Sequence, residues 1–164
     1  ILWRVYHDEL DGFTADNIYM MIGTNNIGIS GEEEILAGIE NIVSAVRVRR
    51  PEAKITLIGI FPRANCEALV ARLNVGIANV AKKMGVNFRD PGKAMLKEDG
   101  TIEPSLFVDG LHPSAEGYER VVKGFIEKSE IFTLQLVEQQ RVIASVMVGL
   151  YGKVLLPYVV IQRS

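Results

Sequence analysis

Short, uninterrupted runs of apolar residues alternate along this chain with longer stretches in which apolar residues recur at helical spacing. The first run is Asn17–Ile22, which ends at Gly23, and the second is Lys54–Phe61, which ends at Pro62. Strands that are apolar without alternation are typical of a sheet covered on both faces. Such strands separated by helices favour an α/β fold, with a parallel sheet between two helix layers.

The stretch between these two runs has the boundary signals of a helix. Ser30 stands three residues before Glu33, which is the spacing of a capping box, and Pro51 marks the far end. Glutamates gather near the predicted start and arginines near the predicted end, as the helix dipole favours. The apolar stripe that this helix would bury consists of Ile35, Ile39, Ile42, Val43 and Val46.

Two further helices are predicted in the same way. One covers Cys66–Met84, with Gly85 as the left-handed residue that ends it. The other covers Ala115–Lys128, with Ser114 as its cap. Their expected buried stripes are Leu69, Leu73, Ile77, Val80 and Met84 in the first, and Val121, Val122, Phe125 and Ile126 in the second.

The remaining element is a short strand, Val86–Phe88, followed by a long loop at 89–106 of the kind that often carries function. In parallel α/β sheets the ligand crevice lies beyond the carboxyl ends of the strands. The sequence therefore predicts a site formed by the residues after Ile22 and by the loop that leads to His112.

Composition narrows the possible functions. The 164 residues suit one domain, and 20 acidic against 18 basic residues leave a net charge of −2. This balance disfavours nucleic acid and a charged membrane surface as partners. Cys66 is the only cysteine and the chain has two histidines, so we expect neither an intrachain disulfide nor a structural zinc. The residues leave a homo-oligomer and the cellular location open.

The segment Gly23–Gly28 follows the first predicted strand. Glycine at a strand end lets the backbone turn sharply, and an asparagine that follows it can offer an amide proton to an oxyanion without transferring it. A polar turn that merely starts the next helix explains the same residues. A phosphate-binding loop is a third reading, although the segment lacks the P-loop lysine and does not match G-x-G-x-x-G.

The second candidate segment contains Asp109 three residues before His112, with Gly110 between them. A carboxylate at this spacing can accept a hydrogen bond from the imidazole Nδ1, which leaves Nε2 as a general base. An aspartate that caps a turn, followed by an unrelated histidine, is the alternative interpretation.

Together, and in this order, the two segments resemble a known superfamily. Ile22–Asn26 resembles the third conserved block of the SGNH (GDSL-type) esterases and lipases, and Asp109–His112 resembles the fifth. The resemblance covers roughly residues 1–128, which we expect to form the hydrolase-like domain, with 129–164 as a C-terminal extension of unknown role. Details that resemble the catalytic subunits of intracellular platelet-activating-factor acetylhydrolase and their bacterial relatives lie at 2–4, 9–11, 51–55 and 61–63.

The resemblance implies a flavodoxin-like three-layer α/β/α sandwich and the hydrolysis of small acyl esters of carbohydrate or lipid through an acyl-serine, without a cofactor. It implies that Asn25 is the oxyanion donor, that His112 is the general base and later the acid, and that Asp109 orients the imidazole. Two alternatives stay open: a non-catalytic binding module on the same fold, and a flavodoxin-like nucleotide-binding domain.

The superfamily's Gly-Asp-Ser block, which carries the nucleophile, has no counterpart in these residues. It would precede Ile1, so we expect an N-terminally truncated chain that is nearly inactive as it stands. The first strand would then have an exposed edge, which is a pairing hazard that the tail could cover. In the tail we expect a helix followed by a strand, Lys153–Ile161, rather than a membrane span over 142–161. We disfavour Ser164 as a displaced nucleophile. Trp3 is expected in the core.

Overall fold

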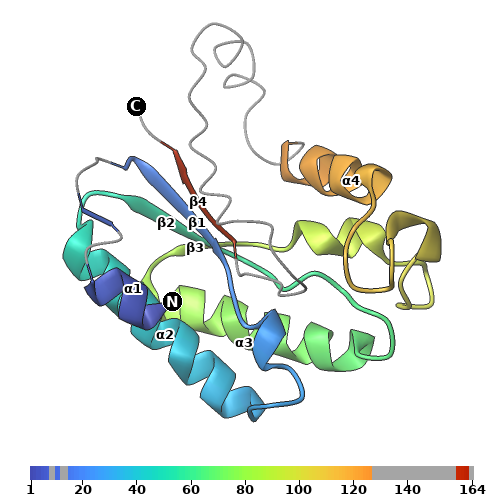
Figure 1. The fold of residues 1–164 in the computed structure, drawn as a ribbon, viewed down its shortest axis with the longest axis horizontal. Coiled ribbons are helices and arrows are strands. Elements are labelled where there is room, and N and C mark those ends of the chain that lie inside the picture. Colours follow the sequence, from blue (N-terminus) through green and yellow to red (C-terminus); the bar gives the residue numbers. More distant parts are fainter. Residues whose placement is uncertain (8–9, 12–14, 127–157, 163–164) are drawn as a thin grey trace, which may run out of the picture.

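The computed structural model describes residues 1–7, 10–11, 15–126 and 158–162 (Figure 1). Its centre is a four-stranded sheet in the order β3-β2-β1-β4. The strands are β1 (Asn17–Met21), β2 (Lys54–Ile58), β3 (Asn87–Arg89) and β4 (Tyr158–Gln162). The α-helices are α1 (Leu2–Tyr6), α2 (Glu32–Arg49), α3 (Glu67–Met84) and α4 (Ala115–Ile126), and the 3₁₀ helices are η1 (Thr24–Asn26), η2 (Pro91–Met95) and η3 (Pro104–Leu106).

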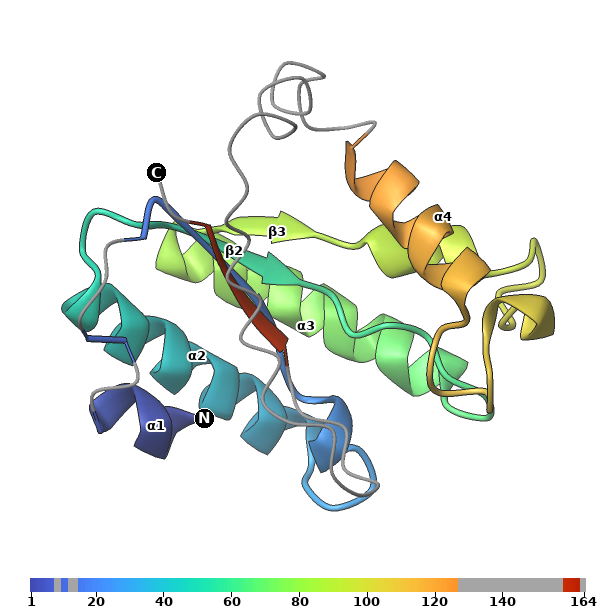
Figure 2. The same cartoon turned by 45° about the horizontal axis from the view of Figure 1, so that its top comes forward.

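Strands β1, β2 and β3 are parallel, as the apolar runs predicted. Asn17 of β1 stands opposite Lys54 of β2, and Thr56 of β2 stands opposite Asn87 of β3. Helices α2 and α3 cross between these strands and cover one face of the sheet, whereas α4 lies on the other side (Figures 1 and 2). The α/β fold with a parallel sheet is therefore confirmed.

The fourth strand runs against the other three. In β4, Tyr158 stands opposite Met21 and Gln162 stands opposite Asn17, so the pairing with β1 is antiparallel. The strand overlaps the predicted Lys153–Ile161 and covers the edge of β1 that would otherwise be open (Figure 2). Its carboxyl end lies beside the amino end of β1. Ser164, which was disfavoured as a displaced nucleophile, lies outside the described residues. The helix predicted before β4 falls outside the described residues.

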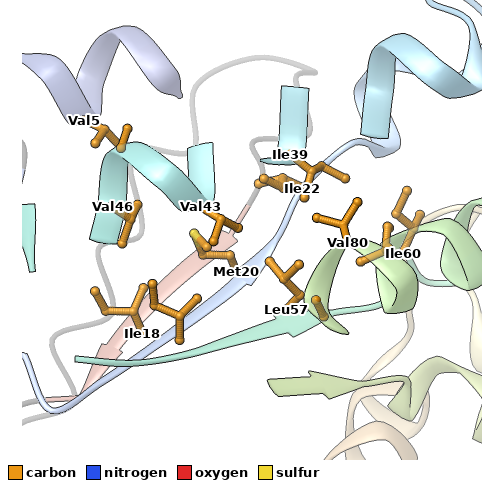
Figure 3. Close-up of a cluster of buried hydrophobic side chains, with 14 of the residues drawn as sticks. Val5, Ile18, Met20, Ile22, Ile39, Val43, Val46, Leu57, Ile60 and Val80 are labelled. Carbon is orange, nitrogen blue, oxygen red and sulfur yellow. The ribbon is translucent and has the colours of Figure 1, made fainter. Parts of the chain in front are cut away.

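The main core lies between the sheet and the α1–α3 layer. Ile18, Met20 and Leu57 point into it from β1 and β2 and are each no more than 1% exposed (Figure 3). The stripe predicted for α2 is buried here, with Ile42 at its partly buried edge. Trp3, by contrast, is 68% exposed and stacks on the ring of His7, so the prediction of a core tryptophan is wrong. In the same helix, Val5 is buried in the core, and Leu2 packs against it while partly buried.

Helix α2 begins one residue later than the capping pattern predicted. Gly31 is its N-cap, and the Gly31 N–H donates to Glu34 rather than a Ser30 hydroxyl bonding the first turn. The Ser30 backbone N–H is already used, because it donates to the Asn26 carbonyl in the preceding loop. Ser30 therefore belongs to the loop, and α2 begins at Glu32.

Two strand boundaries also differ from the prediction for local reasons. Strand β2 ends at Ile58 instead of Phe61, because the backbone of Ile60 bonds the side chain of Asn74 rather than a neighbouring strand. Strand β3 begins after Val86, because the Val86 N–H donates to Ala81 and completes the end of α3. Gly85 closes that end with φ 63°, as expected.

The long segment after β3 is ordered and has its own small core. Met95, Ile102, Leu106 and Phe107 pack there with Val121 of α4. Helix α4 approaches this layer so closely that a Cβ on Gly117 would lie 2.2 Å from the Leu106 carbonyl oxygen. Among the α4 side chains that the structure describes, Val121 is buried as predicted, whereas Val122, which was also predicted to be buried, is 51% exposed. The predicted burial of Phe125 and Ile126 lies outside the described side chains. The segment supports the turn that contains His112.

Candidate active site

The first candidate segment leaves the carboxyl end of β1 in a sharp turn. Gly23 has φ 109°, and a Cβ there would lie 3.1 Å from Ile35 and 3.2 Å from Ile60, so the turn requires glycine. The turn continues into η1, where the Asn26 N–H donates to the Gly23 carbonyl at 3.0 Å. Asn25 therefore lies in the middle of η1, beyond the end of a central strand, where the sequence placed it.

The second candidate segment is a tight turn built around one carboxylate. Asp109 Oδ1 accepts hydrogen bonds from the backbone N–H groups of Leu111 at 3.0 Å and His112 at 2.8 Å. The His112 Nδ1 donates to Asp109 Oδ2 at 2.6 Å. Gly110 makes this possible with φ 77°, and the Val108 N–H closes the turn on the His112 carbonyl at 2.8 Å.

These hydrogen bonds hold Asp109 in its ionised form. The backbone N–H of His112, then its imidazole, then the N–H of Leu111 lower the pKa of Asp109 from 3.8 to about 2. Both side chains are about half exposed, at 47% for His112 and 51% for Asp109. Within the described part of the chain, Nε2 of His112 has no hydrogen-bond partner, so the basic nitrogen is open to a substrate or a nucleophile.

Both segments touch the same turn, which follows β2. Arg63 donates to the carbonyl of Thr24, next to Asn25, and the N–H of Ala64 donates to the carbonyl of Gly110. The η1 turn and the Asp109–His112 turn therefore lie on one side of the molecule, at the edge where the parallel strands end (Figure 1).

A buried polar group near this edge was missed by the sequence reasoning. Asn74 is 7% exposed and lies on the inner face of α3, where its amide bonds Ile60 and reaches Asp90 at 3.3 Å. Burial raises the pKa of Asp90, while Lys93 and Asn74 oppose that shift. The sequence offered a sign of this, because Asn74 is a polar residue beside Leu73 in the apolar stripe predicted for α3.

Other kinds of site find little support in the described ranges. The N-terminal turn of α2 carries Glu32, Glu33 and Glu34, which place negative charge where a phosphate-binding loop needs to attract an anion. Among the residues with described positions, no cluster of three or more histidine, cysteine or acidic side chains is arranged to hold a metal. In the same residues, no helix combines the length and the apolar character of a membrane span.

An amide beyond one strand and a carboxylate-supported imidazole in a nearby turn, at the carboxyl edge of a parallel sheet, are features of α/β acyl hydrolases. A family model, that of the GDSL-like lipase/acylhydrolase family, matches residues 1–120. The chain belongs to the GDSL-like lipase/acylhydrolase family.

Among curated proteins, the chain is similar to subunit alpha2 of platelet-activating factor acetylhydrolase IB from Gallus gallus. The two are 29% identical over 144 residues, which are 85% of this chain and 61% of that protein. It is also similar to subunit alpha1 of the Homo sapiens enzyme, at 30% identity over 75% of this chain and 55% of that protein. The chain thus spans about three fifths of the length of these relatives.

Solved structures show the same fold. A GDSL-like lipase from Bacteroides thetaiotaomicron superposes with a TM-score of 0.62 at 22% identity, over 79% of this chain and 70% of that one. Est24, a carbohydrate acetylesterase from Sinorhizobium meliloti, superposes with a TM-score of 0.60 at 19% identity, over 77% of this chain and 66% of that one. At these identities the likeness concerns the architecture alone.

Proposed function

We propose that the protein is an ester hydrolase that works through an acyl-serine, with His112 as general base and Asp109 as the group that orients it. The observation that carries the proposal is the 2.6 Å hydrogen bond from His112 Nδ1 to a carboxylate that is itself held by two backbone N–H groups. This arrangement selects the tautomer in which Nε2 can accept a proton.

The proposed reaction follows from these positions. Nε2 of His112 removes the proton of a serine hydroxyl as the serine oxygen attacks the ester carbonyl, and Asp109 stabilises the imidazolium that forms. The side-chain amide of Asn25 donates to the oxygen that becomes negatively charged in the tetrahedral intermediate. His112 then returns the proton to the leaving alcohol, and water, activated by the same base, releases the acid from the acyl-serine.

The attacking serine is proposed to come from sequence upstream of Ile1. Among the described serines, the hydroxyls of Ser44, Ser105 and Ser114 donate to Glu40, Glu103 and the Ser105 carbonyl respectively, and none of them is bonded to His112. Ser114 also accepts the Gly117 N–H as the cap of α4. These serines have structural partners, which favours a nucleophile supplied by another segment.

The substrate class is proposed from the relatives. Platelet-activating factor acetylhydrolase and a carbohydrate acetylesterase both remove acetyl groups, according to their names. We infer that small acyl esters of a lipid or a carbohydrate are the substrates of this chain too. We further propose that residues 1–128 form the hydrolase domain and that 129–164 is a C-terminal extension, from which β4 pairs with β1.

The test compares esterase activity in two forms of the protein. We expect the 164-residue chain to hydrolyse p-nitrophenyl acetate little faster than buffer, and a form that includes the upstream genomic sequence to turn it over. In the longer form, His112→Gln should lower kcat/KM by at least about 10³-fold, because proton transfer from the nucleophile is lost.

The control is the other histidine of the chain, His7, which stacks on Trp3. His7→Gln should stay within about twofold of the wild type, since its ring lies outside the proposed site. Equal losses in both variants, or full activity of the 164-residue chain, would show that the catalytic assignment is wrong. A longer form that binds esters without turning them over would favour the non-catalytic binding module.

A further inference from the structure

The turn that follows β2 makes contact with both halves of the candidate site. The guanidinium Nη1 of Arg63 donates to the carbonyl oxygen of Thr24 at 3.2 Å, immediately before Asn25. The next residue, Ala64, donates its backbone N–H to the carbonyl oxygen of Gly110 at 2.8 Å, inside the Asp109–His112 turn. Two adjacent residues thus bridge segments that are far apart in the sequence.

The root of this turn is anchored to α3. Asn74 accepts the Ile60 N–H at 2.8 Å and donates to the Ile60 carbonyl at 2.9 Å, so one buried side chain replaces both strand partners of that residue. A Cβ on Gly59 would lie 2.9 Å from Asn74 Nδ2 and equally close to Asp90 Oδ1, so only glycine leaves room for Asn74 to reach Ile60. We call this pair of Asn74 hydrogen bonds to Ile60 the clamp. The Gly59 N–H adds a bond to the Arg89 carbonyl at 2.8 Å.

The tip of the turn is also constrained. The Cys66 N–H donates to the Arg63 carbonyl at 3.2 Å, and between them Asn65 adopts φ 62°, the one positive φ among the described non-glycine residues. Asparagine tolerates this conformation better than other non-glycine residues, so the sequence suits the tight turn. On the other side, a Cβ on Gly110 would lie 3.0 Å from the Cβ of Ala64, so the two turns are in close contact.

From this network we infer that residues 60–65 form a positioning element, which fixes the position of the Asn25 turn relative to the Asp109–His112 turn. Arg63 is the positioning residue for the first and Ala64 for the second. What the positioned groups do rests on the proposed function, whereas the mechanical link rests on the hydrogen bonds alone. It matters because an oxyanion donor must lie within about 2.7–3.1 Å of the developing charge, and a misplacement of about 1 Å can lower the rate by about 10²-fold.

The mechanical link is tested by amide hydrogen exchange in the 164-residue chain. The Asn26 and Ile27 N–H groups bond within η1, and the Val108 N–H closes the His112 turn. In Arg63→Ala, exchange at Asn26 and Ile27 should become at least about tenfold faster, while Val108 stays protected because the Ala64 bond remains. Arg63→Lys, which keeps one donor, should restore part of the protection.

The matched control is Arg72→Ala, which removes an exposed arginine that pairs with Glu32 on the surface. Exchange at Asn26 and Ile27 should be unchanged there. Wild-type protection of these amides in Arg63→Ala, or equal acceleration in both variants, would overturn the inference.

Kinetics in the longer form supply the second readout. Arg63→Ala should lower kcat for p-nitrophenyl acetate by about 10–100-fold with KM within about twofold, because the misplaced amide acts in the transition state. A rise in KM alone, or an unchanged kcat, would contradict a positioning role. If the wild-type longer form has no esterase activity, the proposed function fails, and the exchange experiment still decides whether Arg63 holds the η1 turn.

Discussion

At the scale of single residues, the site depends on one carboxylate with several partners. The Asp109 carboxylate accepts hydrogen bonds from two backbone N–H groups and from the imidazole of His112, all within a four-residue turn. The sequence predicted this pairing because an aspartate three residues before a histidine, with glycine between them, allows a tight turn. It could not predict the backbone bonds, which depend on how the turn closes onto Val108.

The titration of Asp109 follows from these bonds. Its pKa should lie near 2 instead of 3.8, so the turn gains stability from the carboxylate at pH values above the ordinary pKa and loses it as the pH falls through about 2. Carboxyl ¹³C NMR measures the midpoint, and Asp109→Asn identifies the resonance by its loss. A midpoint at or above 3.8 would show that the hydrogen bonds to the carboxylate do not persist in solution.

At the scale of elements, the helices were predictable because caps and apolar stripes are local signals. The predicted end of α3 is confirmed at Gly85, and the stripe of α2 faces the core. The predicted boundaries were wrong where a backbone group forms a hydrogen bond to a residue outside the predicted element. The Ile60 N–H bonds Asn74 instead of a strand, so β2 ends early, and the Ser30 N–H bonds the Asn26 carbonyl, so α2 begins later.

Two glycines, one that ends a helix and one inside a helix, offer a matched test of backbone strain. Gly85 has φ 63° and Gly38 lies within α2, and a Cβ at either position would have nothing within 4 Å. Gly85→Ala should therefore lower the free energy of unfolding by about 1 kcal/mol through strain alone. Gly38→Ala should raise it by about 0.5–1 kcal/mol, because alanine favours the helix.

Urea denaturation of the two variants measures both changes. Gly85→Asn should lose less than Gly85→Ala, since asparagine tolerates the left-handed region. The same sign of change in Gly85→Ala and Gly38→Ala would contradict the left-handed end of α3.

At the scale of the whole molecule, β4 completes the sheet beside β1. Its antiparallel pairing, from Asn17 opposite Gln162 to Met21 opposite Tyr158, covers the edge of a central strand. An open edge beside a strand as apolar as β1 would be a template for pairing with other chains.

Removal of β4 should therefore promote association. A chain that ends at Pro157 should form more and larger assemblies in light scattering after size exclusion than a chain that ends at Gln162, measured at equal concentration. The second chain is the control, because it keeps all five pairs with β1. Identical size distributions would indicate that β4 does not protect the edge.

Local patterns in the sequence were enough for the α/β class, the parallel strands, the positions of α2, α3 and α4, and the pairing of Asp109 with His112, whereas α1 was not predicted. Apolar periodicity, capping residues and short spacings act over a few residues, so they can be read without the fold. The direction of β4, the clamp of Asn74 on Ile60 and the bridge of Arg63 and Ala64 between the two halves of the site emerged from folding. These contacts join residues distant along the chain, and they depend on which backbone groups the sheet leaves unpaired once the core has packed.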